Sequence, residues 1–180
     1  MKKYAVVLLV LALLLPACAT AYYHPTTFED TAYPTPVYGT LNARMATRTG
    51  PGTQYSEPGT FFSSGDTVKI ISITYDKNGV GWVQVEFSGN GGLMRAYTGI
   101  KRFDNVRKNS VYMENPVGEG VRLSSSCSPL YGPGTKYARH KQNLGAGAVV
   151  YPVEYENGYF MCDYKRSGVW YRGWFPESCL

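Results

Sequence analysis

Cysteine and histidine, the residue types most readily used as a nucleophile and a general base, are few in this sequence. The cysteines and histidines are Cys18, Cys127, Cys162, Cys179, His24 and His140. Cys162 with His140 is the pair to consider, because a thiol beside an imidazole can form a nucleophilic thiolate. No cysteine-peptidase signature surrounds Cys162, and its alternating strand indicates an inert buried thiol. His140 lies in the polar run 138–141, which we expect to be solvated. We therefore expect no enzymatic activity.

Motifs for metal ions and phosphates are also missing from the sequence. It has no Cys-x-x-Cys and no His-x-x-x-His spacing, the patterns typical of zinc ligands. Gly-Pro-Gly-Thr at 50–53 is not followed by the Lys-Ser/Thr of a phosphate-binding loop. The Gly-Pro-Gly segment is typical of a tight turn instead. We expect no metal and no cofactor.

The charge balance is mildly basic. The chain has a formal net charge of +5, of which Lys2 and Lys3 supply two. Such a charge suits association with an anionic wall polymer or membrane surface, and equally solubility alone. The basic stretches 101–102 and 107–108 are too modest to indicate nucleic acid, and we interpret them as a solvated surface.

The first residues form a targeting segment. Lys2 and Lys3 precede the apolar run 6–15, which is too short to span a membrane stably. Two exits follow: Ala-Thr-Ala at 19–21 predicts cleavage before Tyr22, and Leu-Pro-Ala-Cys at 15–18 resembles a lipoprotein box that would leave Cys18 lipidated. We favour simple cleavage. Either exit predicts a secreted or cell-envelope protein, held at a membrane only if Cys18 carries lipid.

An internal repeat organises the rest of the chain. Segment 50–55, Gly-Pro-Gly-Thr-Gln-Tyr, recurs 82 residues later at 132–137 as Gly-Pro-Gly-Thr-Lys-Tyr. Two further pairs match at a spacing of 77 residues: 81–87 with 158–164, and 95–97 with 172–174. The first copy therefore holds five more residues between its motifs. We place them in a hairpin loop around Asn78-Gly79, a strong turn signal.

Each copy is predicted to consist of short strands. Segment 67–73 is rich in β-branched residues, and 83–87 alternates apolar and polar side chains. The Gly-rich segment 88–92 predicts a turn before another strand at 93–97. Short strands separated by Gly-rich turns are typical of a small all-β sandwich or barrel.

The motifs of the first copy resemble the bacterial Src-homology-3 (SH3) family. They are Ala-Thr-Arg-Thr-Gly-Pro-Gly-Thr-x-Tyr at 46–55, Gly-Asp at 65–66 and Gly-Trp-x-x-Val at 81–85. The second copy closes with Arg-Gly-Trp-Phe at 172–175, near the family's ending, although it opens atypically at 127–131. The resemblance implies two SH3-like β-barrels in tandem. The expected boundaries are: signal peptide 1–21, linker 22–40, barrel 41–104, linker 105–114 and barrel 115–180.

The resemblance also implies a function. Exported proteins with such domains usually bind peptidoglycan, another wall ligand or a protein partner. We expect a monomeric, non-catalytic binding module for a cell-wall polymer. The alternative is an extracellular scaffold for a peptide or an exported protein, and a third possibility is that the second copy has become purely structural.

Aromatic side chains near the expected strand ends are candidates for contact with a sugar ring or a peptide. They are Tyr55, Trp82, Tyr97, Tyr137, Tyr159 and Trp174. A domain of about 60 residues also needs such side chains for its core, and packing is the interpretation that we favour for each. Tyr55 and Tyr137 are the best candidates for a groove, because they directly follow turns.

The cysteines allow one disulfide in an oxidising compartment. Three cysteines remain after Cys18, so three pairings are open. Cys127 opens the second copy and Cys179 closes it, and the first and last strands of an SH3-like barrel are neighbours. The resemblance therefore favours a bond between Cys127 and Cys179.

Overall fold

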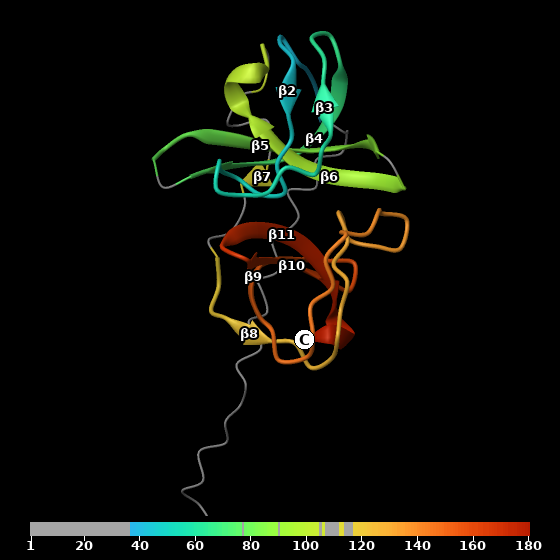
Figure 1. The fold of residues 1–180 in the computed structure, drawn as a ribbon. Helices are drawn as coiled ribbons and strands as arrows, with labels where there is room; N and C mark the ends of the chain where they lie inside the picture. The colour runs from blue at the N-terminus through green and yellow to red at the C-terminus, as the bar shows by residue number, and fades with distance from the viewer. Residues whose placement is uncertain (1–36, 77, 90, 105, 107–111, 114–116) are drawn as a thin grey trace, which may run out of the picture.

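The protein is all-β in the part of the chain that the structure describes. This computed structural model describes residues 37–76, 78–89, 91–104, 106, 112–113 and 117–180. Antiparallel sheets dominate it, and the only helices in these ranges are single 3-10 turns. The two halves of the chain are stacked, with the first copy of the repeat above the second in the view of Figure 1.

The first half contains one larger and one smaller sheet. The larger sheet has the order β1-β4-β5-β6, with β7 beside β4. Its strands are β1 (Val37–Thr40), β4 (Thr67–Tyr75), β5 (Gly81–Gly89), β6 (Gly92–Gly99) and β7 (Tyr112–Met113). β2 (Met45–Ala46) and β3 (Phe61–Phe62) form the smaller sheet, and the 3-10 turn η1 (Ile100–Arg102) follows β6.

The second half contains a four-stranded sheet of order β11-β10-β9-β8. Its elements are β8 (Val121–Arg122), β9 (Val149–Glu156), β10 (Tyr159–Arg166), β11 (Val169–Pro176) and the 3-10 turn η3 (Glu177–Cys179). The all-β prediction is confirmed. No closed barrel is found in either half among the described residues, because each sheet remains open in its pairing order.

The predicted turn at Asn78-Gly79 is confirmed. Asp76 Oδ1 accepts hydrogen bonds from the backbone N–H of Asn78 (2.9 Å) and Val80 (3.0 Å). Gly79 has φ +73°, a conformation that glycine adopts without strain. The connection between β4 and β5 is longer than the one between β9 and β10, so the additional residues of the first copy lie where the repeat predicted them.

Backbone hydrogen bonds also recur between the two halves. The N–H of Asn42 donates to Arg102 (2.9 Å), and at the matching position Ser124 donates to Cys179 (2.8 Å). The N–H of Gly65 donates to Leu41 (2.8 Å), and Gly147 correspondingly donates to Leu123 (2.7 Å). The sequence repeat is therefore also a repeat of tertiary contacts.

The structure extends the first sheet into both expected linkers. β1 occupies the end of the linker predicted at 22–40, and β7 lies within the one predicted at 105–114. The other described residues place no element in either linker. The signal peptide and Cys18 lie outside the described residues. No helix long and apolar enough to cross a membrane occurs in the described ranges.

Both faces of the central strands are buried. Val83 and Val85 of β5 point into a core with Ile73, while Gln84 on the opposite face is only 1 % exposed. In β10, Cys162 and Tyr164 point into the core of the second half, and Asp163 on the opposite face is 2 % exposed. An alternating strand exposes one face unless a second layer covers it. Here that layer is the other half of the chain.

Candidate functional site at the junction of the two halves

The faces of β5–β6 and β10–β11 that point away from their own cores meet each other. We call this contact the junction; it is made by these two hairpins and by the loops that carry Tyr55 and Tyr137. A small apolar cluster that includes Val153, Met161 and Trp174 lies within it, with Leu93 of β6 packed against it. The junction also contains charged side chains, whose partners decide its chemistry.

The first of two charged networks is centred on Asp163. Arg172 donates two hydrogen bonds to this carboxylate, from Nε to Oδ1 (2.6 Å) and from Nη2 to Oδ2 (3.0 Å). Tyr55 Oη of the first half donates to Asp163 Oδ2 (2.6 Å). Arg172 Nη1 in turn donates to Tyr97 Oη (3.0 Å). The side chains of Arg172 and Asp163 are 4 % and 3 % exposed, so this ion pair is shielded from water.

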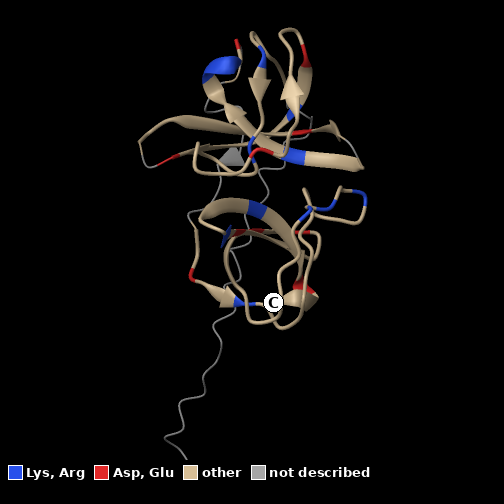
Figure 2. Cartoon of the chain, viewed as in Figure 1, with Lys and Arg blue, Asp and Glu red and all other residues tan. Residues whose placement is uncertain are grey.

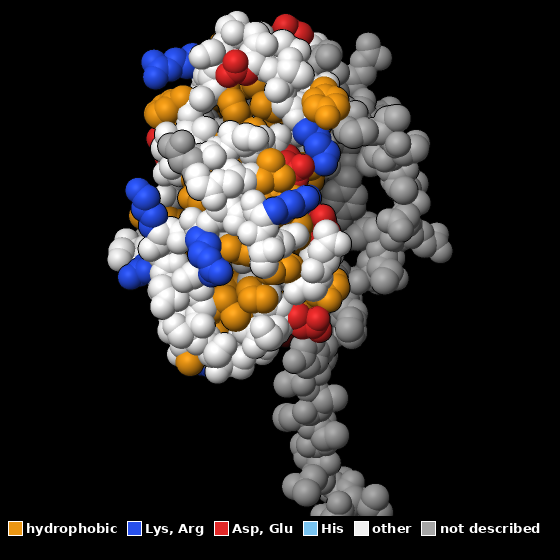
Figure 3. All heavy atoms as spheres, turned by 90° about the vertical axis from the view of Figure 1, so that its right-hand side faces the viewer, with side chains coloured by type: hydrophobic (Ala, Val, Ile, Leu, Met, Phe, Trp, Pro, Cys, Tyr) orange, Lys and Arg blue, Asp and Glu red, His pale blue; other side chains and the backbone are white. Residues whose placement is uncertain are grey.

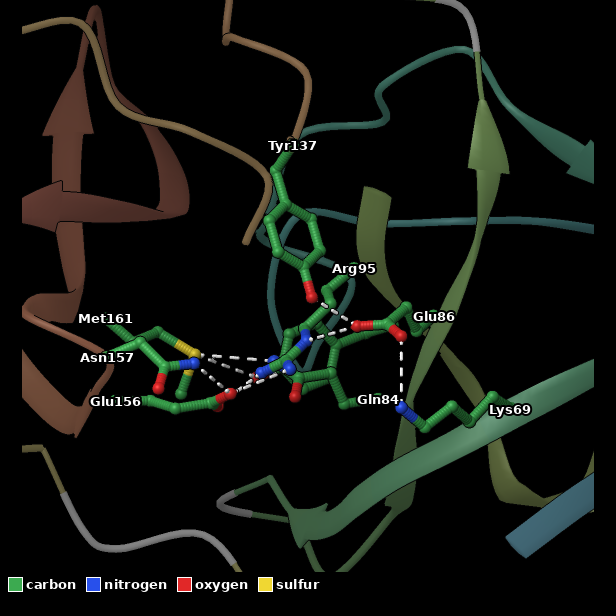
Figure 4. Close-up of polar contacts among 9 residues, drawn as sticks. Lys69, Gln84, Glu86, Arg95, Tyr137, Glu156, Asn157 and Met161 are labelled. Carbon is green, nitrogen blue, oxygen red and sulfur yellow. Dashed lines mark hydrogen bonds and ion pairs between the residues drawn. The ribbon is translucent and has the colours of Figure 1, made fainter. Parts of the chain in front are cut away.

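The second network repeats the first with the halves exchanged (Figure 4). Tyr137 of the second half donates from Oη to Glu86 Oε2 of the first half. Arg95 Nε donates to the same oxygen (3.0 Å). Arg95 also donates from Nη1 and Nη2 to the carboxylate of Glu156 on β9 (2.7 and 3.1 Å). Lys69 Nζ adds a contact to Glu86 Oε1 (3.1 Å).

Three residues of each network, a tyrosine, an arginine and a carboxylate, occupy matching positions in the repeat. Tyr137 corresponds to Tyr55, Arg95 to Arg172, and Glu86 to Asp163. Each tyrosine ring also lies near the arginine that shares its carboxylate, at 5.7 Å for Arg172 over Tyr55 and 5.5 Å for Arg95 over Tyr137. Each half therefore inserts a tyrosine into the carboxylate–arginine pair of the other half.

Backbone contacts fix the inserted loops in place. Tyr55 forms a parallel bridge with Trp170 of β11, and Tyr137 forms the matching bridge with Leu93 of β6. The N–H of Ser56 donates to Trp170 O and the N–H of Ala138 donates to Leu93 O, both at 2.9 Å. Each loop thus pairs along the edge strand of the opposite hairpin, which orients its tyrosine toward the buried pair.

Glycine is required where each loop folds over its own tyrosine. A Cβ at Gly50 would overlap the ring of Tyr55, and a Cβ at Gly132 would overlap the ring of Tyr137. The Gly-Pro-Gly segments were interpreted as turns, and the structure gives their first glycine this additional role. The conserved spacing of glycine and tyrosine within the two copies therefore reflects a packing contact.

Glu86 and Arg95 of the junction stay ionised because each has a charged partner. Burial opposes ionisation of Glu86, but hydrogen bonds from Tyr137 and Arg95 lower its pKa to about 2. Burial would by itself lower the pKa of Arg95, and Glu156 raises it above the usual value instead. Burial raises the pKa of both Tyr55 and Tyr137, so these hydroxyls remain neutral donors. These groups satisfy one another across the junction, so the arrangement holds the two halves together.

The structure places most of the predicted ligand-contacting residues inside the protein. Tyr55, Trp82, Tyr97, Tyr137 and Trp174 are all buried, and Tyr159 is half-buried. Tyr55, Tyr97, Tyr137 and Trp174 line the junction, and Trp82 Nε1 donates to Asp76 Oδ2 (3.3 Å) in the first half. A ligand can therefore reach the five buried rings only if the surrounding structure opens. In this structure these rings pack inside the protein, which was the interpretation favoured for them.

Two of the three described cysteines lie together. Cys127 and Cys179 are both buried, with their Sγ atoms 2.6 Å apart. The structure has them as free thiols, so the preferred partners are neighbours but the predicted disulfide is not formed in it. Burial and the neighbouring thiol raise the pKa of Cys127 to about 12. Cys162 is fully buried, and burial raises the pKa of its thiol well above the usual value.

The expected solvent exposure of His140 is wrong. Its ring is buried, stacks on Tyr131 with centroids 3.9 Å apart, and shares a hydrogen bond of 3.0 Å between Nδ1 and Tyr164 Oη. The segment is extended, so Ala138 and His140 point inward while Arg139 and Lys141 point outward. Because the segment consists mainly of polar residues, this alternation of buried and exposed positions could not be recognised from the sequence.

In the described ranges, no group of three or more potential metal ligands is present.

Sequence reasoning missed the charged residues of the junction. Glu86 and Asp163 occupy matching positions in the repeat, as do Arg95 and Arg172. A carboxylate and an arginine retained at matching places on adjacent strands were the available signal. Their burial could not be inferred, because polar positions of an alternating strand normally face water.

Comparison of the chain with protein-family models, with curated proteins and with solved structures gives no match.

Proposed function

We propose that this chain is an exported, non-catalytic binding module built of two SH3-like β-barrels in tandem, and that it binds peptidoglycan or another cell-wall polymer. The resemblance of both copies to the bacterial SH3 family supports the barrel assignment, and the apolar segment near the N-terminus supports export. The burial of Cys162, which raises the pKa of its thiol, is consistent with a binding role.

The observation that carries the proposal is the reciprocal insertion of Tyr55 and Tyr137. It fixes two similar units in one orientation rather than leaving them on a flexible tether. A wall polymer is a repetitive ligand, and two sites held at a fixed spacing gain affinity when both engage the same polymer. The outer surfaces of the two halves are the binding surfaces in this proposal.

Co-sedimentation with purified peptidoglycan tests the proposal. Residues 22–180 are incubated with peptidoglycan, with and without wall teichoic acid, over a range of salt concentrations. Pelleting that persists at high salt supports a specific wall ligand. Pelleting that disappears at moderate salt indicates charge association alone, and no pelleting under any condition removes the wall-binding proposal.

A protein scaffold is the second candidate function. Exposed aromatic side chains in the first half favour it: Tyr38 is 57 % exposed and Phe61 is 53 % exposed, with the Arg44 guanidinium 5.2 Å from the centre of the Phe61 ring. Tyrosine, phenylalanine and arginine are common at protein interfaces. Retention of a specific exported protein, with no pelleting on peptidoglycan, would favour this function over wall binding.

A further inference from the structure

The second half carries a stack of aromatic rings that runs from its core to its surface. Tyr131 lies on His140 with centroids 3.9 Å apart, and Nδ1 of His140 is 3.0 Å from Tyr164 Oη. Tyr164 in turn stacks on Tyr171, with centroids 5.3 Å apart and an interplanar angle of 12°. His140 and Tyr164 are buried, whereas Tyr131 and Tyr171 at the two ends are half-buried.

The hydroxyl groups at the two ends are available for hydrogen bonding. Within the described ranges, no protein group hydrogen-bonds to Oη of Tyr131 or Tyr171, and neither is among the buried polar atoms. Burial raises the pKa of the Tyr131 hydroxyl. The backbone bridge between Leu130 and Trp174 places the loop of Tyr131 beside β11, the strand that carries Tyr171. A tyrosine hydroxyl can both donate and accept a hydrogen bond.

Basic side chains without acidic partners lie beside this stack. Arg166, in the strand that carries Tyr164, is exposed and donates from Nη1 to the backbone oxygen of Asn143 (3.2 Å). Lys141, two positions before Asn143 in the chain, is also exposed. Among the described residues, neither Arg166 nor Lys141 forms a salt bridge. Figure 2 shows basic residues on a loop of this half, and Figure 3 shows basic side chains beside hydrophobic ones on one face of the molecule.

The first half serves as an internal control for these residues. At the matching positions it has Thr49 for Tyr131, Pro58 for His140, Phe87 for Tyr164, Met94 for Tyr171, Gly89 for Arg166 and Gly59 for Lys141. Its β5–β6 hairpin nevertheless pairs along its length as the β10–β11 hairpin does. The fold therefore does not require the tyrosines and cations of the second half, which need another explanation.

We propose that the half-buried Tyr131 and Tyr171, together with Arg166 and Lys141, form a binding site for an anionic saccharide. The hydroxyls of the two tyrosines can donate hydrogen bonds to sugar hydroxyls and accept hydrogen bonds from them. The guanidinium of Arg166 suits a carboxylate or a phosphate, which it can bind with two parallel hydrogen bonds. This site deepens the proposed wall-binding function and rests on it for its biological ligand.

A nucleic acid strand fits these observations less well. Base stacking requires open ring faces, whereas one face of Tyr131 is covered by His140 and one face of Tyr171 by Tyr164. The features left accessible are the hydroxyls and the cations, which match a ligand rich in hydroxyls and negative charge. An oligonucleotide is therefore included in the test as a competing outcome.

The test measures binding of small probes to residues 22–180 by nuclear magnetic resonance titration. Tetragalacturonate supplies carboxylates and glucose 1-phosphate supplies a phosphate, while maltotetraose is neutral. We expect at least one anionic sugar to bind about tenfold more tightly than maltotetraose. Binding of tetragalacturonate alone assigns a carboxylate-bearing saccharide, and binding of glucose 1-phosphate alone assigns a phosphorylated one. No binding of either sugar would overturn the proposal, as would equal binding of oligo(dT) or tetraglutamate.

Variants assign the binding to this site. Arg166→Gln removes an exposed side-chain hydrogen bond to Asn143 O, and the double variant Tyr131→Phe/Tyr171→Phe keeps both rings, so both should fold. Each should weaken binding of the anionic sugar about tenfold. Lys101→Gln, which removes an exposed basic side chain of the first half, should leave the binding unchanged. Equal loss in all three would show non-specific charge binding and refute the site.

The wall assay separates this inference from the proposed function. Pelleting that is the same for wild type, Arg166→Gln and the double tyrosine variant would support wall binding and refute this site. Binding of an anionic sugar that these variants weaken, without pelleting on peptidoglycan, would support the site and refute the wall as its target.

Discussion

Tyr55 and Asp163 are separated by 108 positions in the chain, yet the hydroxyl of Tyr55 donates a hydrogen bond of 2.6 Å to the carboxylate of Asp163. The same carboxylate binds Arg172 through two hydrogen bonds. The contact therefore joins the first half of the protein to a charged pair inside the second. Tyr137 and Glu86 form its counterpart in the opposite direction.

Replacing Asp163 should be strongly destabilising. Asp163→Asn would leave the charge of Arg172 buried without a counter-ion, which typically costs about 3–5 kcal/mol. Urea denaturation measures the loss in the free energy of unfolding. Glu57→Gln is the matched control. The side chain of Glu57 is 45 % exposed, so loss of its salt bridge to Arg48 should cost less than about 1 kcal/mol. A similar loss in both variants would contradict the role assigned to the buried pair.

The two junction tyrosines should contribute to stability through their hydroxyls. Tyr55→Phe and Tyr137→Phe each remove one hydrogen bond to a carboxylate and keep the ring, so each should cost about 1.5–3 kcal/mol. Differential scanning calorimetry should show a lower unfolding temperature. Pelleting on peptidoglycan should be unchanged for the fraction that remains folded, and a specific loss of pelleting would instead make these residues direct ligand contacts.

Adding one methyl group at the first glycine of either loop should disturb the junction. Gly50→Ala and Gly132→Ala would place a Cβ against the ring of Tyr55 or Tyr137, and we expect a loss of about 1–3 kcal/mol for this overpacking. Gly145→Ala provides the control, because a Cβ there has open space around it. Equal stability of all three variants would show that the loops adjust without cost.

Acid should destabilise the protein through His140. Burial lowers the pKa of this histidine from 6.5 to about 3, so the unfolded chain binds a proton in that range while the folded protein does not. The free energy of unfolding should therefore fall as the pH drops from about 6.5 toward 3, by an amount on the order of 5 kcal/mol. Glu86, with its pKa lowered from 4.5 to about 2, should add a loss only below about pH 4.5.

His140→Gln separates these two contributions. It should flatten the stability curve between pH 6.5 and 4.5 while leaving the steeper fall at lower pH. Stability measured by urea denaturation at closely spaced pH values provides the readout. An unchanged curve in this variant would mean that His140 is not the group responsible.

Oxidation should link Cys127 to Cys179. Their sulfur atoms already lie 2.6 Å apart, and the bond would close a loop across 52 positions of the chain, worth about 4 kcal/mol in the chain-entropy description. The protein treated with a disulfide oxidant should lose the mass of two hydrogen atoms and unfold at a higher temperature, reversibly with dithiothreitol. Cys162→Ser should retain this response and Cys127→Ser should lose it. An oxidant response that depends on Cys162 would assign the pairing differently.

The strands and turns could be predicted from local sequence because they depend on local chemistry. The alternation in 83–87 and the Asn78-Gly79 pair specify a strand and a tight turn wherever they occur. The strand Val37–Thr40 could not be predicted, because its hydrogen-bond partners are in β4 and only pairing with them makes this Pro-flanked stretch a strand.

The sequence by itself determined that this is an all-β protein built from a repeated unit, since side-chain alternation, turn residues and matched spacing are properties of the linear chain. The tertiary structure alone decided what the polar strand positions do. Charged residues at these positions are typical of a strand face in contact with water; here they are Glu86, Arg95, Asp163 and Arg172. Packing of the two hairpins excludes water from these side chains and pairs their charges. Burial of these charges depends on residues that are distant in the chain. For the same reason, the contacts of Tyr55 and Tyr137 with the opposite half could be found only in the tertiary structure.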